Sequence, residues 1–555
     1  DFLHPHTYHS GGNISITANA ANPKSIVAGR TLTIGNFVGQ NPYNGGDVTI
    51  QNVDLTATDT DYKGYLWLTG QGKLTVSNSD LTAYANEESQ DDFLQFGHMY
   101  GLVGTAFNRG VTITDSTIAA GTFASINNND LHESDDPGPP YNYNRSAAGD
   151  IVIKSATGDS ISAPFAIVVG NDTNTGKVEL DNMTLTGTQG IAGTRGAFIM
   201  VTSWGNIVLK DSELSTSWTT PDGFGSGFIK LQSHTGATLN NTDILAGTEV
   251  DISNVALANP PHPPIPASGD IFANDDSTIR SANASVTIIN YGGDVILFSD
   301  EISAHENITL FANGGLGTYV VVGDATTPGT MTATTGFIDI NSSVHVTINA
   351  ALQADTNVTI TSDISSGGTI IIQNNVTANK GFIDVNTSGT LIINDAIFSA
   401  INDGADIMLN AGAGMLLTDS NLTADDNIWL HTTGWDVVHL GHITLTNTDI
   451  TSNNGSVDVY GAFNNSRIAM DANSSIDAAG IVTMSASAQI TAGNITAGSD
   501  ILFDVRQATG GMLNVIGPVS STTDGNIYLT AGDMAIGADV TTTAGDIYLY
   551  DYDQG

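Results

Sequence analysis

The chain contains no cysteine among its 555 residues. This absence excludes disulfide bonds, thiolate metal ligands and a cysteine nucleophile. Basic residues are also scarce, because 15 Lys and Arg against 57 Asp and Glu leave a formal net charge of −42. Such a charge repels nucleic acid and anionic membranes, so we exclude both as main partners. No segment approaches the roughly 18 consecutive apolar residues of a membrane-spanning helix.

The composition nevertheless belongs to a folded chain. Hydrophobic residues make up 40% of the sequence, charged residues only 13%, and there are 61 glycines. This balance is unlike that of a disordered chain and suits many short strands joined by turns. No segment shows the apolar periodicity of an amphipathic helix, so we predict almost no helix.

A short repeat near the C-terminus indicates how such strands are organised. The string GNIYL at 525–529 returns as GDIYL at 545–549, twenty residues later. A unit of this size, with three short strands, cannot bury its own apolar side. It buries that side by stacking on copies of itself, which predicts a β-solenoid.

The first half of the repeat recurs along most of the chain. It consists of Gly or a polar residue followed by apolar-x-apolar, and this period of two predicts a strand with one buried face. Copies lie at 11–16, 45–50, 72–76, 109–113, 149–153, 176–180, 205–209, 292–297, 306–310, 336–340, 368–372, 381–385, 426–430, 441–445, 455–459 and 499–503.

The second half of the repeat reads apolar-x-Asn/Asp-x-x-Leu/Ile, as at 50–55, 76–81, 113–118, 180–185, 209–214, 239–244, 417–422 and 445–450. The alternation slips by one residue at the Asn or Asp. These two residue types tolerate left-handed backbone, so a sharp bend is expected there. Stacking would then align Asn52, Asn78 and Asp115 in a column, with asparagine side chains bonded between coils.

Together these patterns predict an all-β fold: a single elongated parallel β-helix with about 20–30 residues per coil. At about 4.8 Å per coil, roughly 22 coils would span about 100 Å. We expect an N-terminal arm at 1–10 and a continuous solenoid over 11–555. Three stretches near 84–109, 121–148 and 253–268 are proline-rich, charged or too long for a turn, and are predicted to be loop insertions.

The strings GGDVTIQNVDLTA, GNIVLKDSEL and AGDIYLY resemble the repeats of filamentous-haemagglutinin-like adhesins, the exoproteins of two-partner secretion. The resemblance covers most of the chain but is a periodic pattern. It implies a right-handed parallel β-helix, an extracellular location and an adhesive or stalk function. Where that family's secretion module carries an Asn-Pro-Asn-Gly-type motif, this chain reads NPYNGG at 41–46.

Metal sites are weakly indicated. His4, His6 and His9 fit either a metal-binding tail or a docking arm, and we favour the arm. Asp172 and Asn174 open a calcium-type loop, but position twelve of that loop is methionine rather than the bidentate glutamate that such loops need. We therefore predict no cofactor, with calcium as the alternative.

Catalytic chemistry is also weakly indicated. The string Asn-Thr-Asp at 241–243 and 447–449 resembles part of a polygalacturonase site, yet both copies fall at the predicted bend. The Gly-His-Gly partner of that family is absent, since 441–443 reads Gly-His-Ile. We predict no catalytic residues and no enzymatic activity. A carbohydrate-active β-helix enzyme, a polysaccharide lyase or hydrolase, is the alternative.

Three outward aromatic residues, Trp429, Tyr528 and Tyr548, can stack sugar rings or form an aromatic ladder between coils. The chain ends one strand into a fresh coil, so we expect either a longer protein or ends that mate with neighbouring copies. The predicted function is structural: the subunit of a cell-surface filament or the shaft of a large adhesin. Its expected partners are copies of itself end to end, with surface glycans or other cells as further candidates.

Overall fold

The structure is a computed structural model, and the alternating apolar positions of the repeat form strands throughout it. It describes residues 12–36, 46–58, 64–70, 72–84, 102–107, 109–128, 149–171, 176–188, 197–217, 227–256, 266–274, 276–299, 301–315, 317–362, 367–402, 404–433, 441–462, 465–506 and 510–551. These residues contain only strands, turns and bends, and no helix. The chain divides into two compact units, Asp1–Gly293 and Asp294–Gly555, and each is described by itself.

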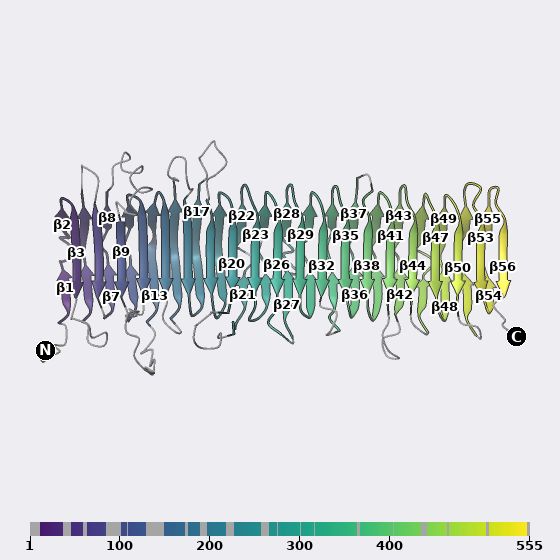
Figure 1. The fold of residues 1–555 in the computed structure, drawn as a ribbon, viewed down its shortest axis with the longest axis horizontal. Coiled ribbons are helices and arrows are strands. Elements are labelled where there is room, and N and C mark those ends of the chain that lie inside the picture. The colour runs from purple at the N-terminus through teal and green to yellow at the C-terminus, as the bar shows by residue number, and fades with distance from the viewer. Residues whose placement is uncertain are drawn as a thin grey trace, which may run out of the picture. The chain divides into compact units, whose positions relative to one another are not determined.

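In the first unit each coil gives two consecutive strands, or one long bent strand, to a parallel sheet that we call sheet 1. The next strand of the coil belongs to a second parallel sheet, sheet 2 (Figure 1). The sheet 1 strands are β1 (Ile14–Thr17), β2 (Lys24–Ala28), β4 (Val48–Gln51), β5 (Val53–Ala57), β7 (Leu74–Ser77), β8 (Leu81–Ala83), β10 (Val111–Thr114), β11 (Ile118–Ala120), β13 (Ile151–Ala163), β15 (Val178–Gly187), β17 (Ile207–Thr216), β19 (Ala237–Ala246), β21 (Ile271–Ala273) and β22 (Thr278–Ser281). The sheet 2 strands are β3 (Thr31–Asn36), β6 (Tyr65–Gly70), β9 (Leu102–Phe107), β12 (Phe123–Asn128), β14 (Ala166–Asn171), β16 (Phe198–Ser203), β18 (Ile229–Ser233), β20 (Val250–Asn254) and β23 (Val286–Asn290).

The second unit repeats this plan with more regular coils. Its sheet 1 strands are β24 (Val295–Leu297), β25 (Glu301–Ala304), β27 (Tyr319–Val322), β28 (Thr330–Ala333), β30 (His345–Ile348), β31 (Ala351–Ala354), β33 (Ile370–Ile372), β34 (Val376–Ala378), β36 (Thr390–Asn394), β37 (Ile397–Ala400), β39 (Gly414–Thr418), β40 (Asn421–Ala424), β42 (His442–Thr446), β43 (Asp449–Ser452), β45 (Arg467–Met470), β46 (Ser475–Ala478), β48 (Gln489–Ala492), β49 (Asn494–Ala497), β51 (Met512–Val515), β52 (Val519–Ser521), β54 (Asp533–Ile536) and β55 (Val540–Thr542). Its sheet 2 strands are β26 (Ile308–Ala312), β29 (Ile338–Ser342), β32 (Val358–Ser362), β35 (Ile383–Thr387), β38 (Ile407–Ala411), β41 (Ile428–Thr432), β44 (Val457–Gly461), β47 (Val482–Ala486), β50 (Ile501–Val505), β53 (Ile527–Ala531) and β56 (Ile547–Asp551).

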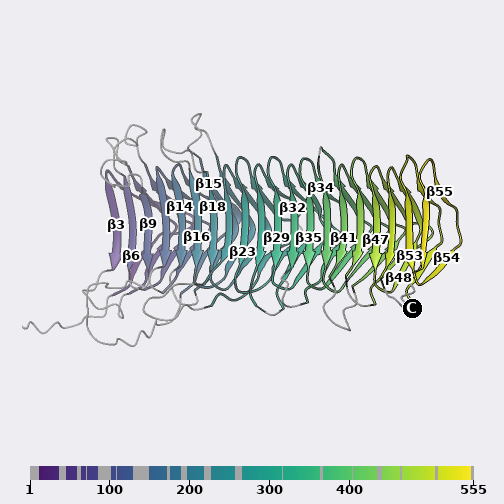
Figure 2. The ribbon, with the colours of Figure 1, turned by 45° about the vertical axis from the view of Figure 1, so that its right-hand side comes forward.

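Within each unit, strands of successive coils pair in parallel and lie side by side in both views (Figure 2). Inward positions of adjacent coils are register partners, as Ile338 with Val358 and Ile340 with Ile360, and all four side chains are fully buried. Each fully buried aliphatic side chain contributes about 1.5–3 kcal/mol, and here the coils on either side supply the burial. The prediction of an all-β parallel solenoid is confirmed, while its handedness stays a prediction.

Coil length stays close to the expected 20–30 residues in the second unit, whereas in the first unit some coils fall within that range and others exceed it. Register partners on sheet 2 lie 19 residues apart at Val482 and Ile501, and 30 apart at Ile308 and Ile338. In the first unit, Phe123 and its partner Ala166 lie 43 residues apart. The residues between these two partners include 129–148, which lie outside the described residues.

The predicted insertions are too wide at their ends. Residues 102–107 of the first range form β9, which pairs with β6 and β12. Residues 123–128 of the second range form β12, and 253–254 of the third belong to β20. Sequence alone placed these residues outside the sheets because charged or proline-rich neighbours obscure the short apolar alternation. The remainder of these ranges lies largely outside the described residues, as does the predicted arm at 1–10.

Candidate functional site

The Asn or Asp of the second half-repeat turns the chain within sheet 1. All eight residues at this predicted position have φ angles between 48° and 55°: Asn52, Asn78, Asp115, Asn182, Asp211, Asn241, Asp419 and Asn447. Asp395 adopts the same conformation. Left-handed backbone is strained for most residues and is tolerated by Asn and Asp, so the bend prediction is confirmed. We call this set of residues the bend column.

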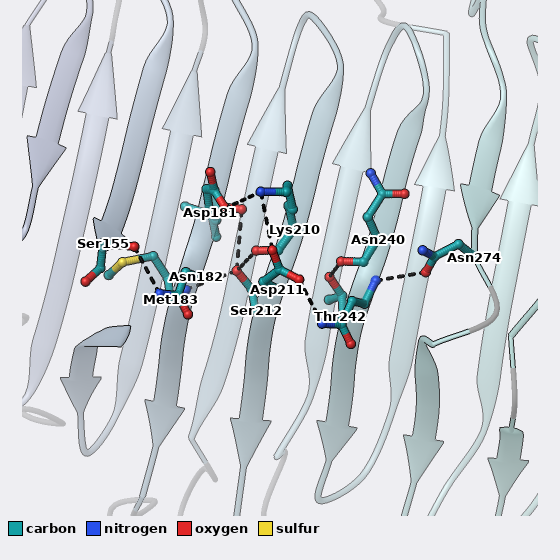
Figure 3. Close-up of polar contacts among 12 residues, drawn as sticks. Ser155, Asp181, Asn182, Met183, Lys210, Asp211, Ser212, Asn240, Thr242 and Asn274 are labelled. Atoms are coloured by element: carbon teal, nitrogen blue, oxygen red, sulfur yellow. Dashed lines mark hydrogen bonds and ion pairs between the residues drawn. The ribbon is translucent and has the colours of Figure 1, made fainter. Parts of the chain in front are cut away.

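Side chains of the bend column bond to the preceding coil. The Asn241 Nδ2 atom donates to Asp211 Oδ1 at 2.7 Å, and Asn447 Nδ2 donates to Asp419 Oδ1 at 2.6 Å. Asn182 Nδ2 instead donates to the backbone oxygen of Ser155 at 3.0 Å (Figure 3). The expected bonding between coils is present, but its acceptors are carboxylates and a backbone carbonyl rather than other asparagines.

A buried hydroxyl follows the bend in many coils, and sequence reasoning missed it. Ser212 Oγ donates to the Lys210 carbonyl at 2.7 Å and accepts the Met183 N–H of the preceding coil at 3.2 Å (Figure 3). Thr242, which is fully buried, makes the equivalent bond to the Asn240 carbonyl. The signal was present in the sequence, because Ser or Thr stands directly after the bend residue in copies such as 78–79, 115–116 and 447–448.

Charged groups surround the bend in the first unit. Lys210 Nζ lies 3.1 Å from Asp181 Oδ1 and 3.3 Å from Asp211 Oδ2 (Figure 3). The hydrogen bond to Asp181, followed by that to Asp211, raises the pKa of Lys210. The hydrogen bond from Asn241, followed by that from Lys210, lowers the pKa of Asp211. All these groups are in contact with water, and such pairs fix side-chain positions more than they stabilise the fold.

The two Asn-Thr-Asp strings are parts of this bend. In the first string Asn241 bonds to Asp211, and Asp243 accepts a hydrogen bond from Thr278 of the next coil. In the second, Asp449 likewise accepts from Ser475. Each polar group thus has a partner that follows from stacking, as predicted from their position at the bend.

A second set of polar side chains stands directly before the sheet 2 strands of the second unit. In this entry column a side-chain oxygen accepts the backbone N–H at the same place in the following coil. The acceptor and donor pairs are Asn307 with Phe337, Asn357 with Phe382, Asp406 with Asn427, Asn427 with Ser456, Ser456 with Ile481, Asp500 with Asn526, and Asn526 with Asp546. These bonds extend the backbone ladder by one position beyond the strands.

Asparagine pairs of the kind expected at the bend occur instead inside the first unit, at the end of sheet 2 strands. Asn128 Nδ2 donates to Asn171 Oδ1 at 3.2 Å, and Asn254 Nδ2 donates to Asn290 Oδ1 at 3.0 Å. All four residues are fully buried. Their amides also bond to backbone carbonyls of the adjoining turns, as Asn128 does to Gly149 at 2.7 Å. These bonds satisfy polar backbone at a corner that water does not reach.

The outer face of sheet 2 in the second unit carries a cluster of aromatic and charged side chains. His431 Nε2 lies 2.9 Å from Asp458 Oδ2. The His431 ring also meets the Tyr460 ring edge to face, with centroids 5.7 Å apart. Trp429 is the register partner of Asp458 on the same face. The cluster therefore combines flat rings with hydrogen-bonding groups of both kinds.

Arg506 reaches this cluster from two coils further along. Its Nε atom lies 3.2 Å from Asp504 Oδ2, and its guanidinium carbon lies 5.2 Å from the centre of the Tyr460 ring. The Nη1 atom is 3.4 Å from the Tyr460 hydroxyl. Between these two coils lies β47, where Ser485 is the register partner of both Tyr460 and Asp504. Ser485 is only 3% exposed, and its Oγ atom has no hydrogen-bond partner.

Outward tyrosines near residue 550 form the predicted aromatic ladder. The rings of Tyr528 and Tyr548 stack with centroids 4.9 Å apart and an interplanar angle of 6°. Tyr548 also stacks against Tyr550 at 6.0 Å. For these residues the ladder explains the aromatic side chains, whereas Trp429 lies between Met408 and Asp458 in its column.

The coil formed by β54, β55 and β56 pairs with the preceding coil on one side. Its inward-facing apolar residues are exposed as a result: Ile536 by 43%, Ile547 by 43% and Leu549 by 55%. The equivalent residues one coil earlier, Ile527 and Leu529, are fully buried. A further coil on this side, whether from the same polypeptide or from another chain, would bury these residues.

The candidate metal ligands His4, His6, His9, Asp172 and Asn174 all lie outside the described residues. Within the described ranges, no group of three or more His, Cys, Asp or Glu side chains is placed to hold a metal ion. The same residues include no helix with the length and apolar character needed to cross a membrane.

Comparison with known proteins adds no relative to this description. No family model matches the chain, and no curated protein or solved structure matches it either.

Proposed function

We propose that the chain is a structural extracellular protein that acts as a stiff rod, as the subunit of a cell-surface filament or the shaft of a large adhesin. The observation that carries the proposal is that three kinds of contact join successive coils within each unit. Backbone ladders join the strands, apolar columns fill the space between the sheets, and the bend column adds side-chain bonds at a corner. A stack joined in this way resists bending and extension, which attachment requires.

The charge supports a location outside the cell. A net charge of −42 on a chain with 13% charged residues keeps a stacked β protein dispersed, because like-charged rods repel one another sideways. The absence of cysteine means that stability does not depend on the redox conditions of a compartment.

We propose a second copy of this chain as the partner that covers the apolar side of β54–β56. The first described coil, β1–β3, presents partly exposed Ile14 and Ile16, whose register partners Val48 and Ile50 are fully buried. Joining the two edges would continue both sheets and cover apolar residues on each. Because the two surfaces differ, the contact is heterologous, and it produces an open filament when the rotation between copies does not close a ring.

Negative-stain electron microscopy of the purified chain tests this proposal. We expect unbranched fibres that lengthen with protein concentration. The double variant Ile547→Lys with Leu549→Lys places charge on the inward side of β56 and should abolish the fibres. The matched control is Tyr548→Lys, which changes the outward side of the same strand and should leave them.

Particles that stay the length of one chain at every concentration would refute the end-to-end partner. Fibres that the double lysine variant still forms would show that another surface makes them. For the location, a protease added to intact source cells should remove the protein. Its complete protection from that protease would contradict the extracellular assignment.

A further inference from the structure

The Arg506 side chain acts as a strap across the outer face of sheet 2. It begins at the end of β50, is held by Asp504, and ends over the Tyr460 ring on β44. Strand β47 lies between these two strands, so the strap crosses it, and Ser485 of β47 is the register partner of both Tyr460 and Asp504. The guanidinium therefore lies over one face of the Tyr460 ring.

Ser485 is unusual for an outward position. It alternates with partly exposed Thr483 on the same face, yet it is 3% exposed and its hydroxyl bonds to nothing. A buried hydroxyl without a hydrogen-bond partner is energetically unfavourable. The Ser485 hydroxyl can therefore still donate a hydrogen bond to a ligand or accept one from it. Ligand sites commonly present such a group beside an apolar wall.

The side chains around this hydroxyl fit the chemistry of a sugar. The apolar C–H face of a hexose packs on an aromatic ring, which Tyr460 supplies. Its hydroxyl groups need donors and acceptors at the ring's edge, which the His431–Asp458 pair and Ser485 supply. Uncharged ligands are favoured because Asp458 and Asp504 already pair with His431 and Arg506, and the net charge of −42 repels anions.

The spacing of these groups fits a chain of sugars. His431, Tyr460, Ser485 and Asp504 occupy one column of register partners, so they recur about every 4.8 Å along the direction of stacking. An extended β-linked glycan advances by a similar distance per sugar. Successive sugars of such a chain would meet successive coils.

We propose that the outer face of sheet 2 at β41, β44, β47 and β50 binds a neutral, β-linked hexose chain. Arg506 covers the Tyr460 ring when no glycan is bound, and glycan binding moves it aside to reach Ser485. This binding site goes beyond the structural role and does not depend on filament formation.

Isothermal titration calorimetry of the full chain with cellohexaose, a neutral β-1,4-linked hexasaccharide, tests the proposal. Arg506→Ala uncovers the ring and should bind cellohexaose roughly tenfold more tightly than the unmodified chain. Tyr460→Ala removes the ring and should bind at least about tenfold more weakly. Phe311→Ala, the control, removes an aromatic side chain from the same sheet at β26, far from β41, and should change the affinity by less than about twofold.

Further variants separate binding from folding. Tyr460→Phe keeps the ring without its hydroxyl and should retain affinity, which would show that a loss in Tyr460→Ala is not a loss of structure. Ser485→Ala should melt at the same temperature as the unmodified chain or higher, because it breaks no bond and removes a buried hydroxyl without a partner, yet it should bind cellohexaose more weakly.

The proposal fails if neither the unmodified chain nor Arg506→Ala binds cellohexaose. It also fails if Arg506→Ala and Tyr460→Ala change affinity in the same direction. Tighter binding of an oligogalacturonate of equal length would overturn the assignment to a neutral glycan. None of these results affects the filament proposal, which electron microscopy tests separately.

Discussion

The side-chain amide of Asn241 lies 2.7 Å from Asp211 Oδ1, although the two residues are 30 positions apart in the sequence. Both have a φ angle of 48°. The residue that bends the chain in one coil therefore also bonds to the residue that bends the preceding coil. The backbone bend and the hydrogen bond between coils therefore depend on the same residue, so a substitution at this position affects both.

Asn241→Ala should destabilise the first unit. The left-handed backbone costs alanine about 1–2 kcal/mol, and the lost hydrogen bond to Asp211 adds about 1 kcal/mol. Asn241→Gly keeps the backbone conformation and should lose only the hydrogen bond. Amide hydrogen exchange of β17 and β19 measures both effects. Asn240→Ala, one residue earlier and partly exposed, is the control, and equal exchange in all three variants would contradict the prediction.

Leu209→Ala should weaken the core of the first unit by about 2–5 kcal/mol. Leu209 is fully buried between its register partners Leu180 and Leu239, so its removal leaves a cavity shared by three coils. We expect hydrogen exchange to rise in β15, β17 and β19 and to stay unchanged in distant coils. Val208→Ala changes the outward side of the same strand and should have little effect. A uniform rise along the whole unit would refute this local behaviour.

Asp384→Asn should stabilise the second unit at neutral pH. Burial raises the pKa of Asp384, and its Oδ1 atom is enclosed without a hydrogen-bond partner. Because the pKa of Asp384 is raised in the folded state, protonation of this carboxyl favours folding, and that contribution is complete below the ordinary aspartate pKa of about 3.9. The contribution is lost as the pH rises through the raised pKa of the folded state. The variant should therefore melt about 1–2 °C higher at pH 7 and equally at pH 3.

Two further variants separate the effect of burial from the effect of net charge. Asp339→Asn should behave in the same way, because burial raises the pKa of Asp339 on the same face. Asp477→Asn removes one charge from an exposed position and measures the general effect of lowering the net charge. If Asp477→Asn raises the melting temperature as much as Asp384→Asn does, burial is not the cause.

Lys210→Met should leave the melting temperature almost unchanged, although Lys210 contacts both Asp181 and Asp211. The Lys210 side chain is 52% exposed, so water and salt screen both pairs. Thermal melts at low and high salt provide the measurement. A loss of several degrees that disappears in high salt would show that the two ion pairs matter more than their exposure indicates.

The bends were predictable from the sequence because their cause is local. An Asn or Asp that breaks a period-two alternation indicates left-handed backbone without any knowledge of neighbours, and Asn52 and Asp211 both follow this rule. Inward positions such as Leu209 were predictable for a similar reason, because the alternation of apolar and polar residues within one strand indicates its buried face.

The candidate site on sheet 2 could not be predicted because it depends on register. Arg506 meets Tyr460 across 46 residues, and that contact exists only when β44, β47 and β50 are aligned as they are. Coil lengths vary from 19 residues upward, so the sequence does not show which outward residues become neighbours. Trp429 was recognised as outward, but nothing in its own segment indicates His431, Asp458 and Tyr460 as a cluster.

The direction of the entry column has a consequence for how the chain acquires its structure. In every pair of this column the earlier coil holds the accepting side chain and the later coil brings the N–H, as Asp500 accepts from Asn526 and Asn526 from Asp546. In a polypeptide that is synthesised from its N-terminus, the accepting side chain of each coil is therefore present before the N–H group that bonds to it. This direction allows each newly synthesised segment to bond to the coil that has already formed, so assembly can proceed from the N-terminus onward.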